Sequence, residues 1–333
     1  MSTVLNPLLM LKPALQWLDS HSEKEALPPE QAQAIQWGRL MPFLTLHLIC
    51  LFVFKVGWSP VAVGVAVFLY AVRMFAITGF YHRYLAHKTY KTSRVFQFMF
   101  AFLGNMSSQR GPLWWAAHHR EHHRNSDETN DIHSPRQQGF WMSHMMWFLR
   151  PMNFETKKEG IKDFMRFPEL VFLDRFDIIA PTVLGFLVFG LGMFLQRFFP
   201  GLHTNGPQML IWGFFISTVV LAHGTFTINS LAHVWGKKRY DTTDDSRNNF
   251  WLAIITLGEG WHNNHHHYAN TVRQGFFWWE IDITYYLLWT LSKVGIVWDL
   301  KPVPARLLAA KPVKIGSEWE GLGLTKPVVS GQI

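Results

Sequence analysis

Four long apolar runs are the feature that most limits what this chain can fold into. They cover about residues 41–57, 61–80, 178–195 and 209–232. The hydrocarbon core of a bilayer is ~30 Å thick, and a helix needs about 20 mostly apolar residues to cross it. Charged residues make up 16% of the chain, against ~25% in ordinary soluble domains. The runs and the low charge together predict an all-α integral membrane protein with four transmembrane helices.

The remaining segments are expected to lie outside the bilayer. We expect residues 1–40 to form an N-terminal segment, residues 41–300 one membrane domain and residues 301–333 a tail. The apolar run 95–103 is about half the length that a span needs, which favours an interfacial or re-entrant helix. The stretch 276–298 is aromatic but carries three charged residues, which favours a helix lying on the membrane surface.

The distribution of basic residues predicts the orientation in the membrane. Residues 81–177 contain fourteen Lys and Arg, whereas the link between the third and fourth runs has Arg197 alone. Cytoplasmic loops carry the excess of Lys and Arg. Residues 81–177, both termini and the segment after the fourth run are therefore expected on the cytoplasmic side. The formal net charge of +8 is spread over these segments rather than gathered in one patch, so no nucleic acid partner is expected.

Histidines form three groups along the chain. The spacing H-x-x-H-H occurs at residues 119–123 and again at 262–266, and an earlier pair is His82 and His87. On a helix, positions i, i+3 and i+4 share one face, and the last two diverge by about 100°. One helix can therefore offer imidazoles to two metal ions a few ångströms apart. Imidazole suits iron, zinc, copper and nickel, so the pattern indicates transition metals without naming one.

Other metal and catalytic motifs are excluded or weak. Cys50 is the only cysteine, which excludes an intramolecular disulfide and any cysteine-based zinc or iron–sulfur site. Soluble di-iron bundles use two E-x-x-H pairs, and only Glu259 with His262 fits here. The roles of two features stay open. Arg73, in the second apolar run, either forms hydrogen bonds inside the helix bundle or marks a functional site. Residues 125–131 form either an acidic turn exposed to water or a source of hydrogen-bond partners for the histidines.

The three histidine groups resemble the histidine boxes of integral-membrane fatty acid desaturases. The matching segments are His-Arg-Tyr-Leu-Ala-His at 82–87, His-Arg-Glu-His-His at 119–123 and Gly-Glu-Gly-Trp-His-Asn-Asn-His-His at 258–266. They most closely resemble the stearoyl-CoA (acyl-CoA Δ9) desaturases of bacterial type. Asn229 and His233 are similar to that family's additional metal motif. The resemblance covers roughly residues 40–300 and implies a cytoplasmic helical cap that holds a di-iron site.

The resemblance also implies the ligands. One Fe²⁺ ion would be held by His82, His87, His119, His123 and His265, and the other by His122, His233, His262 and His266, with Asn229 holding a water. His267, at the end of the third box, is left without a role. No catalytic side chain beyond the metal ligands is implied.

The implied function is an O2-dependent fatty acyl desaturase of a bacterial inner membrane, with its site facing the cytoplasm. It would insert a cis double bond, at Δ9, into a saturated chain carried as acyl-CoA or acyl-lipid. The electrons would come from a separate donor of the ferredoxin or cytochrome type. In one place the chain departs from the acyl-CoA enzymes: His118 and Ala117 stand where those enzymes have an acid preceded by an arginine, which leaves the head group open. Alternatives are a di-iron hydroxylase of alkyl or lipid chains, a metal transporter and a structural membrane protein.

Overall fold

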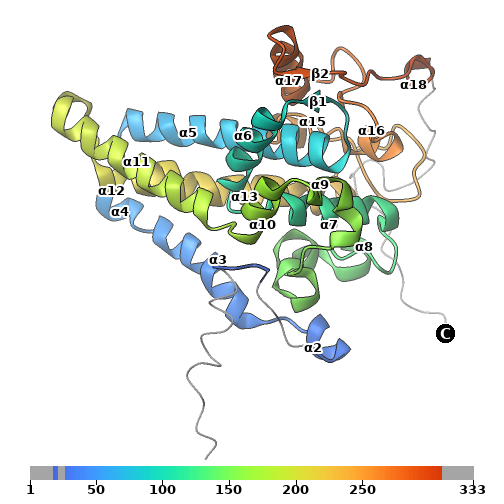
Figure 1. Ribbon diagram of the computed structural model, residues 1–333, viewed down its shortest axis with the longest axis horizontal. Helices are drawn as coiled ribbons and strands as arrows, with labels where there is room; N and C mark the ends of the chain where they lie inside the picture. The colour runs from blue at the N-terminus through green and yellow to red at the C-terminus, as the bar shows by residue number, and fades with distance from the viewer. Residues whose placement is uncertain (1–17, 22–26, 310–333) are drawn as a thin grey trace, which may run out of the picture. The chain divides into compact units, whose positions relative to one another are not determined.

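The computed structural model describes residues 18–21 and 27–309 (Figure 1). Most of the N-terminal segment predicted for residues 1–40, and most of the tail predicted for 301–333, lie outside the described residues. The chain divides into two compact units. Among the described residues, the first unit contains residues 18–21, 27–76, 98–118 and 148–222, and the second contains residues 77–97, 119–147 and 223–309.

Four helical stretches in the described residues are long and apolar enough to cross a membrane. They are Pro29–Val56, Pro60–Ala86, Ile179–Phe198 and Gly206–Val234. The expectation of four long apolar helices and the all-α fold class are therefore confirmed. The second stretch runs past residue 80, where the apolar pattern ends, because the polar side chains that follow are bonded inside the protein. Arg83, for example, is 1% exposed and pairs with Asp282 at 2.9 Å.

The first unit is built around long apolar helices. Its elements are α2 (Pro29–Gln33), α3 (Trp37–Cys50), α4 (Val53–Val56), α5 (Pro60–Phe75), η4 (Pro151–Asn153), η5 (Lys158–Ile161), α9 (Lys162–Met165), α10 (Pro168–Arg175), α11 (Ile179–Phe198), η6 (Pro200–Leu202), α12 (Gly206–Met209) and η7 (Leu210–Ile216). The π-helix η7 contacts α3, α5 and α11. Leu184 and Val188 of α11 pack there with Phe214 of η7 and Met106. This packing forms the apolar core of the unit.

Local sequence signals fix where two of these helices begin. Ser59 caps α5 by accepting a hydrogen bond from the backbone N–H of Ala62, and Pro60 occupies the first helical position. Asn205 caps α12 in the same way through the N–H of Gln208. A short polar side chain before the first turn satisfies a backbone donor that the helix leaves unpaired, and proline there loses nothing because its position needs no donor.

The structure answers the question that the sequence left open for Arg73. The guanidinium is 1% exposed and donates to the carbonyl oxygens of Leu69 and Met106, to Thr218 Oγ1 at 2.7 Å and to Ser217. It therefore bonds inside the helix bundle and does not extend to the membrane surface. A buried cation costs free energy unless its donors are satisfied, and here neutral acceptors satisfy them.

The second unit contains shorter elements. They are η1 (Ala76–Ala86), β1 (Lys91–Thr92), α8 (Pro135–Gln138), η2 (Met142–Met146), α14 (Leu231–Val234), α15 (Phe250–Ile255), α16 (His262–His267), α17 (Ile283–Lys293), β2 (Val297–Trp298) and α18 (Ala305–Ala309). The strands β1 and β2 pair antiparallel, with Lys91 opposite Trp298. The chain passes between the units within η1 and within four further helices: α6 (Arg94–Asn105), α7 (Pro112–Asn125), η3 (Trp147–Leu149) and α13 (Ser217–Asn229).

Two predicted helices outside the spans are present. The run 95–103 lies within α6, and the stretch 276–298 contains α17. Trp278 and Trp289 are 80% and 48% exposed, although tryptophan is a large apolar side chain. Exposed tryptophans are typical of the membrane–water interface, so the surface location expected for 276–298 remains our prediction.

Candidate metal centre

The first pair of histidines sits on an unusual helix. The element η1 is a π-helix, in which residue i bonds residue i+5. The N–H of His87 accordingly donates to the carbonyl of His82 at 3.1 Å. Five residues then make about one turn, so the two imidazoles lie on one face with their ring centroids 4.8 Å apart. An ordinary α-helix would turn these side chains well away from each other.

The second and third groups use ordinary helical spacing. His119, His122 and His123 lie on the last turns of α7. The short helix α16 begins at His262 and includes His265 and His266. The sequence predicted that H-x-x-H-H would present imidazoles from a helix in both places, and the structure shows this.

A glycine turn places the third group. Gly258 has φ +127°, a conformation that side chains rarely adopt, and Gly260 lies against the backbone of α15. Between them Glu259 accepts hydrogen bonds from Arg83 Nη2 at 3.0 Å and Nε at 3.3 Å. Arg83 also pairs with Asp282 and donates to the carbonyl of Val272. This buried network fixes η1 relative to the turn that leads into α16.

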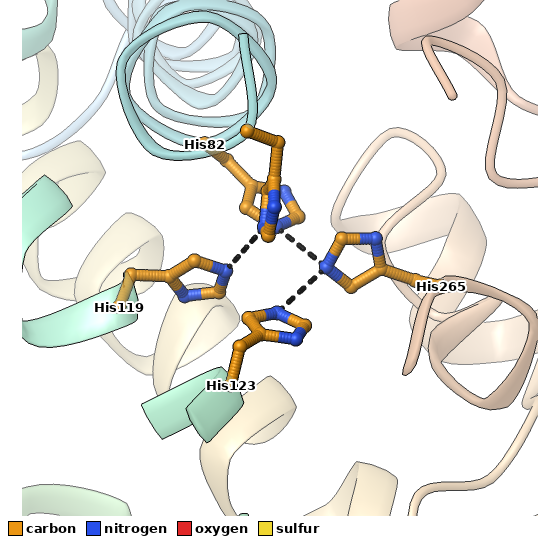
Figure 2. Close-up of side chains that lie close together, drawn as sticks. His82, His119, His123 and His265 are labelled. Carbon is orange, nitrogen blue, oxygen red and sulfur yellow. Dashed lines mark hydrogen bonds between the residues drawn. The ribbon is translucent and has the colours of Figure 1, made fainter. Parts of the chain in front are cut away.

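The nine predicted histidines gather into two groups within the second unit. The five-histidine group contains His82, His87, His119, His123 and His265, and the four-histidine group contains His122, His233, His262 and His266. In each group the candidate ligand atoms lie within 4.8 Å of one another. Figure 2 shows four rings of the first group pointing their nitrogens at a common centre. Nε2 of His265 lies 3.0 Å from Nε2 of His82 and 2.9 Å from Nε2 of His123.

His233 reaches the four-histidine group from another helix. It belongs to α14, just after the break at Ser230 that ends α13. Its Nε2 lies 3.1 Å from Nε2 of His262. Asn229, the predicted holder of a water, is the last residue of α13, and its carbonyl accepts a hydrogen bond from Ser143.

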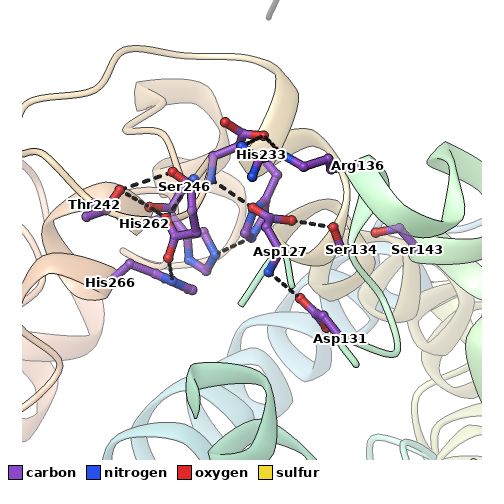
Figure 3. A network of polar contacts seen from close by, with 12 residues as sticks. Asp127, Asp131, Ser134, Arg136, Ser143, His233, Thr242, Ser246, His262 and His266 are labelled. Carbon is purple, nitrogen blue, oxygen red and sulfur yellow. Dashed lines mark hydrogen bonds and ion pairs between the residues drawn. The ribbon is translucent and has the colours of Figure 1, made fainter. Parts of the chain in front are cut away.

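Buried carboxylates bind the outer nitrogens of three rings of the four-histidine group. Nδ1 of His122, His233 and His266 lies 3.0, 2.8 and 2.6 Å from Asp131, Asp127 and Asp244, respectively. Figure 3 shows His233 and His266 in this polar network, together with Asp127 and Asp131. Asp127 and Asp131 of the turn at residues 125–131 are therefore hydrogen-bond partners of imidazoles, whereas residues 128–130 of the same turn are exposed to solvent. A carboxylate on Nδ1–H leaves the lone pair of Nε2 available for a metal and orients the ring.

The donor set fits two transition metal ions. Imidazole nitrogens bind such ions at ~2.0–2.1 Å, so ligand atoms on one ion lie about 3–4 Å apart. The Nε2 separations of 2.9–3.1 Å and the 4.8 Å limit within each group agree with this geometry. Neutral imidazoles suit iron, zinc, copper and nickel, and the groups contain no thiolate or carboxylate ligand.

Burial keeps most of these imidazoles neutral. It lowers the pKa of His119, His123 and His265 well below the usual value, and neighbouring imidazoles lower each pKa further. Burial also acts on His122, but the charge of Asp131 and its hydrogen bond raise the pKa of His122 above the usual value. Only the deprotonated nitrogen of a histidine binds a metal, so a low pKa favours ligation.

Other residues near the four-histidine group were not predicted as functional. The ring of His133 lies 4.3 Å from that of His122, and burial followed by the charge of His122 lowers the pKa of His133 to about 3. His144 bonds Ser230 Oγ at 2.9 Å, and Ser143 bonds the carbonyl of Asn229 at 2.6 Å, so η2 holds the break between α13 and α14. Nothing in the sequence alone signals the role of η2.

Two further histidines lie outside both groups. His118, in the first unit, is 2% exposed and its Nε2 lies 3.1 Å from the carbonyl of Glu155. His267 is exposed, and its ring stacks on Tyr240 with centroids 4.3 Å apart and an angle of 9°. Neither belongs to a group of metal-binding geometry.

A polar pocket of about 180 Å³ opens onto the two groups. His123 and His266, one from each group, line it together with Glu128, Asp241 and Asp244 among others. Its polar lining suits water and ions rather than a hydrocarbon chain. The pocket therefore gives solvent a path to the edges of both groups.

Comparison with known proteins identifies the family. A family model described as fatty acid desaturase matches residues 57–299. The chain belongs to the fatty acid desaturase family. This desaturase is 36% identical over 275 residues to Delta-9 acyl-lipid desaturase 1 of Arabidopsis thaliana, covering 80% of this chain and 85% of that protein.

Bacterial relatives are equally well covered. The desaturase is 32% identical over 281 residues to the sn-2 palmitoyl-lipid 9-desaturase of Nostoc sp. (strain 36), which covers 81% of this chain and 93% of that protein. It is 34% identical over 271 residues to the sn-1 stearoyl-lipid 9-desaturase of Anabaena variabilis. This alignment covers 80% of this chain and 94% of that protein. The desaturase is thus a membrane oxidoreductase of lipid metabolism.

Proposed function

We propose that this protein is an acyl-lipid desaturase that inserts a cis double bond at the Δ9 position, with two irons held by the nine histidines. The observation that carries the proposal is the separation of nine buried or half-buried imidazoles into two groups of metal-binding geometry. The ligands of one iron are the five-histidine group, and those of the other are the four-histidine group. Asn229, four residues before His233, would hold a water on the second iron.

Bound iron would supply the O2-dependent oxidising chemistry that removal of hydrogen from an unactivated methylene requires. In balance, two neighbouring methylenes lose two hydrogen atoms and gain a double bond between their carbons. Two electrons from a separate ferredoxin or cytochrome donor and two protons from solvent complete the reduction of O2 to two waters. The polar pocket beside His123 and His266 gives water and protons a route to the site.

The chain's own residues position these groups. Carboxylates fix the rings of His122, His233 and His266, and Glu259 fixes His82 at 2.5 Å while being held by Arg83. Pre-oriented ligands do not have to reorganise when a metal binds or changes charge.

The choice of acyl-lipid over acyl-CoA rests on two observations. Several relatives carry acyl-lipid or palmitoyl-lipid in their names. His118 and Ala117 stand where acyl-CoA enzymes have a charged pair, and both are buried, so neither presents a charge to a CoA head group. A di-iron hydroxylase of alkyl or lipid chains is the alternative that shares the same metal ligands.

The function can be tested by expressing the protein in a host that lacks desaturase. We expect gas chromatography of total fatty acids to show chains with one new cis double bond, at Δ9. His265→Ala is the matched inactive control, because the Nε2 of His265 lies within 3.0 Å of two other ligands. Purified enzyme should then accept a saturated glycerolipid at least about as well as the corresponding acyl-CoA. Hydroxylated chains, or product from acyl-CoA alone, would contradict the proposal.

The proposed orientation places both termini and the histidine groups in the cytoplasm of a bacterium, at its inner membrane. Replacing Cys50 gives a background for single cysteines at two exposed positions, Gly201 and Thr129. Gly201→Cys lies in the link between α11 and α12, where an added Cβ meets nothing within 4 Å. An impermeant maleimide added to intact cells should label Gly201→Cys, and Thr129→Cys only after lysis. Labelling in the reverse order would mean that the protein is inverted.

A further inference from the structure

The two histidine groups differ in the charges placed behind them. In the four-histidine group, three of the four rings have a carboxylate on Nδ1, and Asp127, Asp131 and Asp244 are 3%, 1% and 5% exposed. Each of these acids faces an imidazole that points its other nitrogen at the proposed metal position. A hydrogen-bonded carboxylate makes an imidazole a stronger electron donor.

The three carboxylates are held in their charged form. Asp127 accepts from Ser134 Oγ and from the N–H of Asp245, and Asp244 accepts from the N–H and Oγ of Ser246. Asp131 accepts from the N–H groups of residues 127 and 133. The four-histidine group therefore has about three negative charges close to it.

The five-histidine group has a more neutral setting. In this group the carboxylate of Glu259 lies 2.5 Å from Nδ1 of His82. Glu259 also accepts two hydrogen bonds from Arg83. Arg83 also pairs with Asp282, so this cation and its two carboxylates together carry about one net negative charge, against about three beside the four-histidine group. The amide of Gln274, which has no charge, lies 3.4 Å from Nδ1 of His265 and 3.2 Å from that of His82. Negative charge stabilises a trivalent ion more than a divalent one, and this effect is large in a buried site.

We infer that Asp127, Asp131 and Asp244 make the two metal positions unequal, so that the ion in the four-histidine group has the lower reduction potential and holds Fe³⁺ when one iron is oxidised. This inference rests on the proposed di-iron function. Electrons from a one-electron donor would reduce the ion of the five-histidine group first and that of the four-histidine group second. The acids therefore set the order in which the pair is reduced.

The test is a redox titration of the purified protein loaded with two irons, followed by Mössbauer spectroscopy. The wild-type protein should show two separate one-electron steps and a half-reduced form with one ferric and one ferrous ion. A single two-electron step would overturn the inference, whatever the variants do.

Substitutions by residues of the same shape show which one-electron step belongs to which histidine group. Asp244→Asn keeps a hydrogen-bond acceptor for His266 but removes its charge, and should raise the lower potential, changing the ratio of oxidised to reduced iron by ~10- to 100-fold at a fixed potential. Gln274→Glu adds a charge beside His265 and should lower the higher potential. If Asp244→Asn moves the higher potential instead, the assignment is wrong.

Asp245→Asn is the matched control. It removes the same charge from the adjacent residue, but the Asp245 side chain pairs with Arg136 and Lys238 and faces no imidazole in these contacts. Both reduction potentials should remain essentially unchanged.

Asp127→Asn, which acts through His233, repeats the test if Asp244→Asn does not retain two irons. If the protein shows two separate one-electron steps but makes no unsaturated product, the proposed function fails while this inference stands.

Discussion

His233→Ala is expected to abolish unsaturated product and to lose one of two bound irons, whereas His267→Ala should keep both. His233 is 2% exposed, with Nε2 3.1 Å from that of His262 and Nδ1 2.8 Å from Asp127. It would supply one of the four proposed ligands of the second iron, from α14. Loss of a residue that merely supports a ligand costs ~10–100-fold in metal affinity or activity, and loss of a ligand should cost more.

His267 is the matched control because it directly follows His265 and His266 in the sequence. A reading by proximity would make it a ligand, but its exposed ring stacks on Tyr240. Bound iron and unsaturated product should be measured in parallel for wild type and both variants. Close to two irons per chain are expected for the wild type. An active His233→Ala with an inactive His267→Ala would show that the second iron site is wrongly assigned.

Much of the fold was predictable because hydropathy reports directly on membrane spans. Four apolar runs predicted the four long helices, and no detail of packing was needed for this. Hydropathy does not show, however, that the helix containing the second predicted span continues to Ala86. His82 and Arg83 are polar, so the apolar pattern stops, while the helix continues because Glu259 and Asp282, nearly two hundred residues away, satisfy Arg83. Sequence cannot show such partners.

The candidate site was predictable in its members but not in its geometry. The repeat of H-x-x-H-H and the family resemblance named the nine histidines that the structure brings together. That His82 and His87 share a face depends on the π-helix η1, which spacing alone does not reveal. Likewise, the pairing of Asp244 with His266 joins residues 22 apart in sequence, and the sequence does not single out Asp244 from Asp241 and Asp245 in the same polar loop.

Gly260→Ala is expected to cost the protein both stability and metal. A Cβ at this position would lie 2.1 Å from the backbone nitrogen of Ala253 and 2.5 Å from the carbonyl oxygen of Asn249. These atoms belong to the main chain at the start of α15 and cannot rotate away. Overpacking a tight site typically lowers the free energy of unfolding by ~1–3 kcal/mol. Because the neighbouring atoms here are rigid, we expect a loss at or above the upper end of that range.

The strain would be relieved by moving the turn at residues 258–261, and His262 follows this turn directly. A shift of that size would break the 3.1 Å approach of His262 to His233, so iron should be lost from the four-histidine group first. Gly64→Ala in α5 is the matched control, since its Cβ meets nothing within 4 Å and alanine is the better helix former by ~1 kcal/mol. Thermal unfolding and bound iron should be measured for both variants. If Gly260→Ala kept two irons and the wild-type melting temperature, the close contact with α15 would not be what positions the third histidine group.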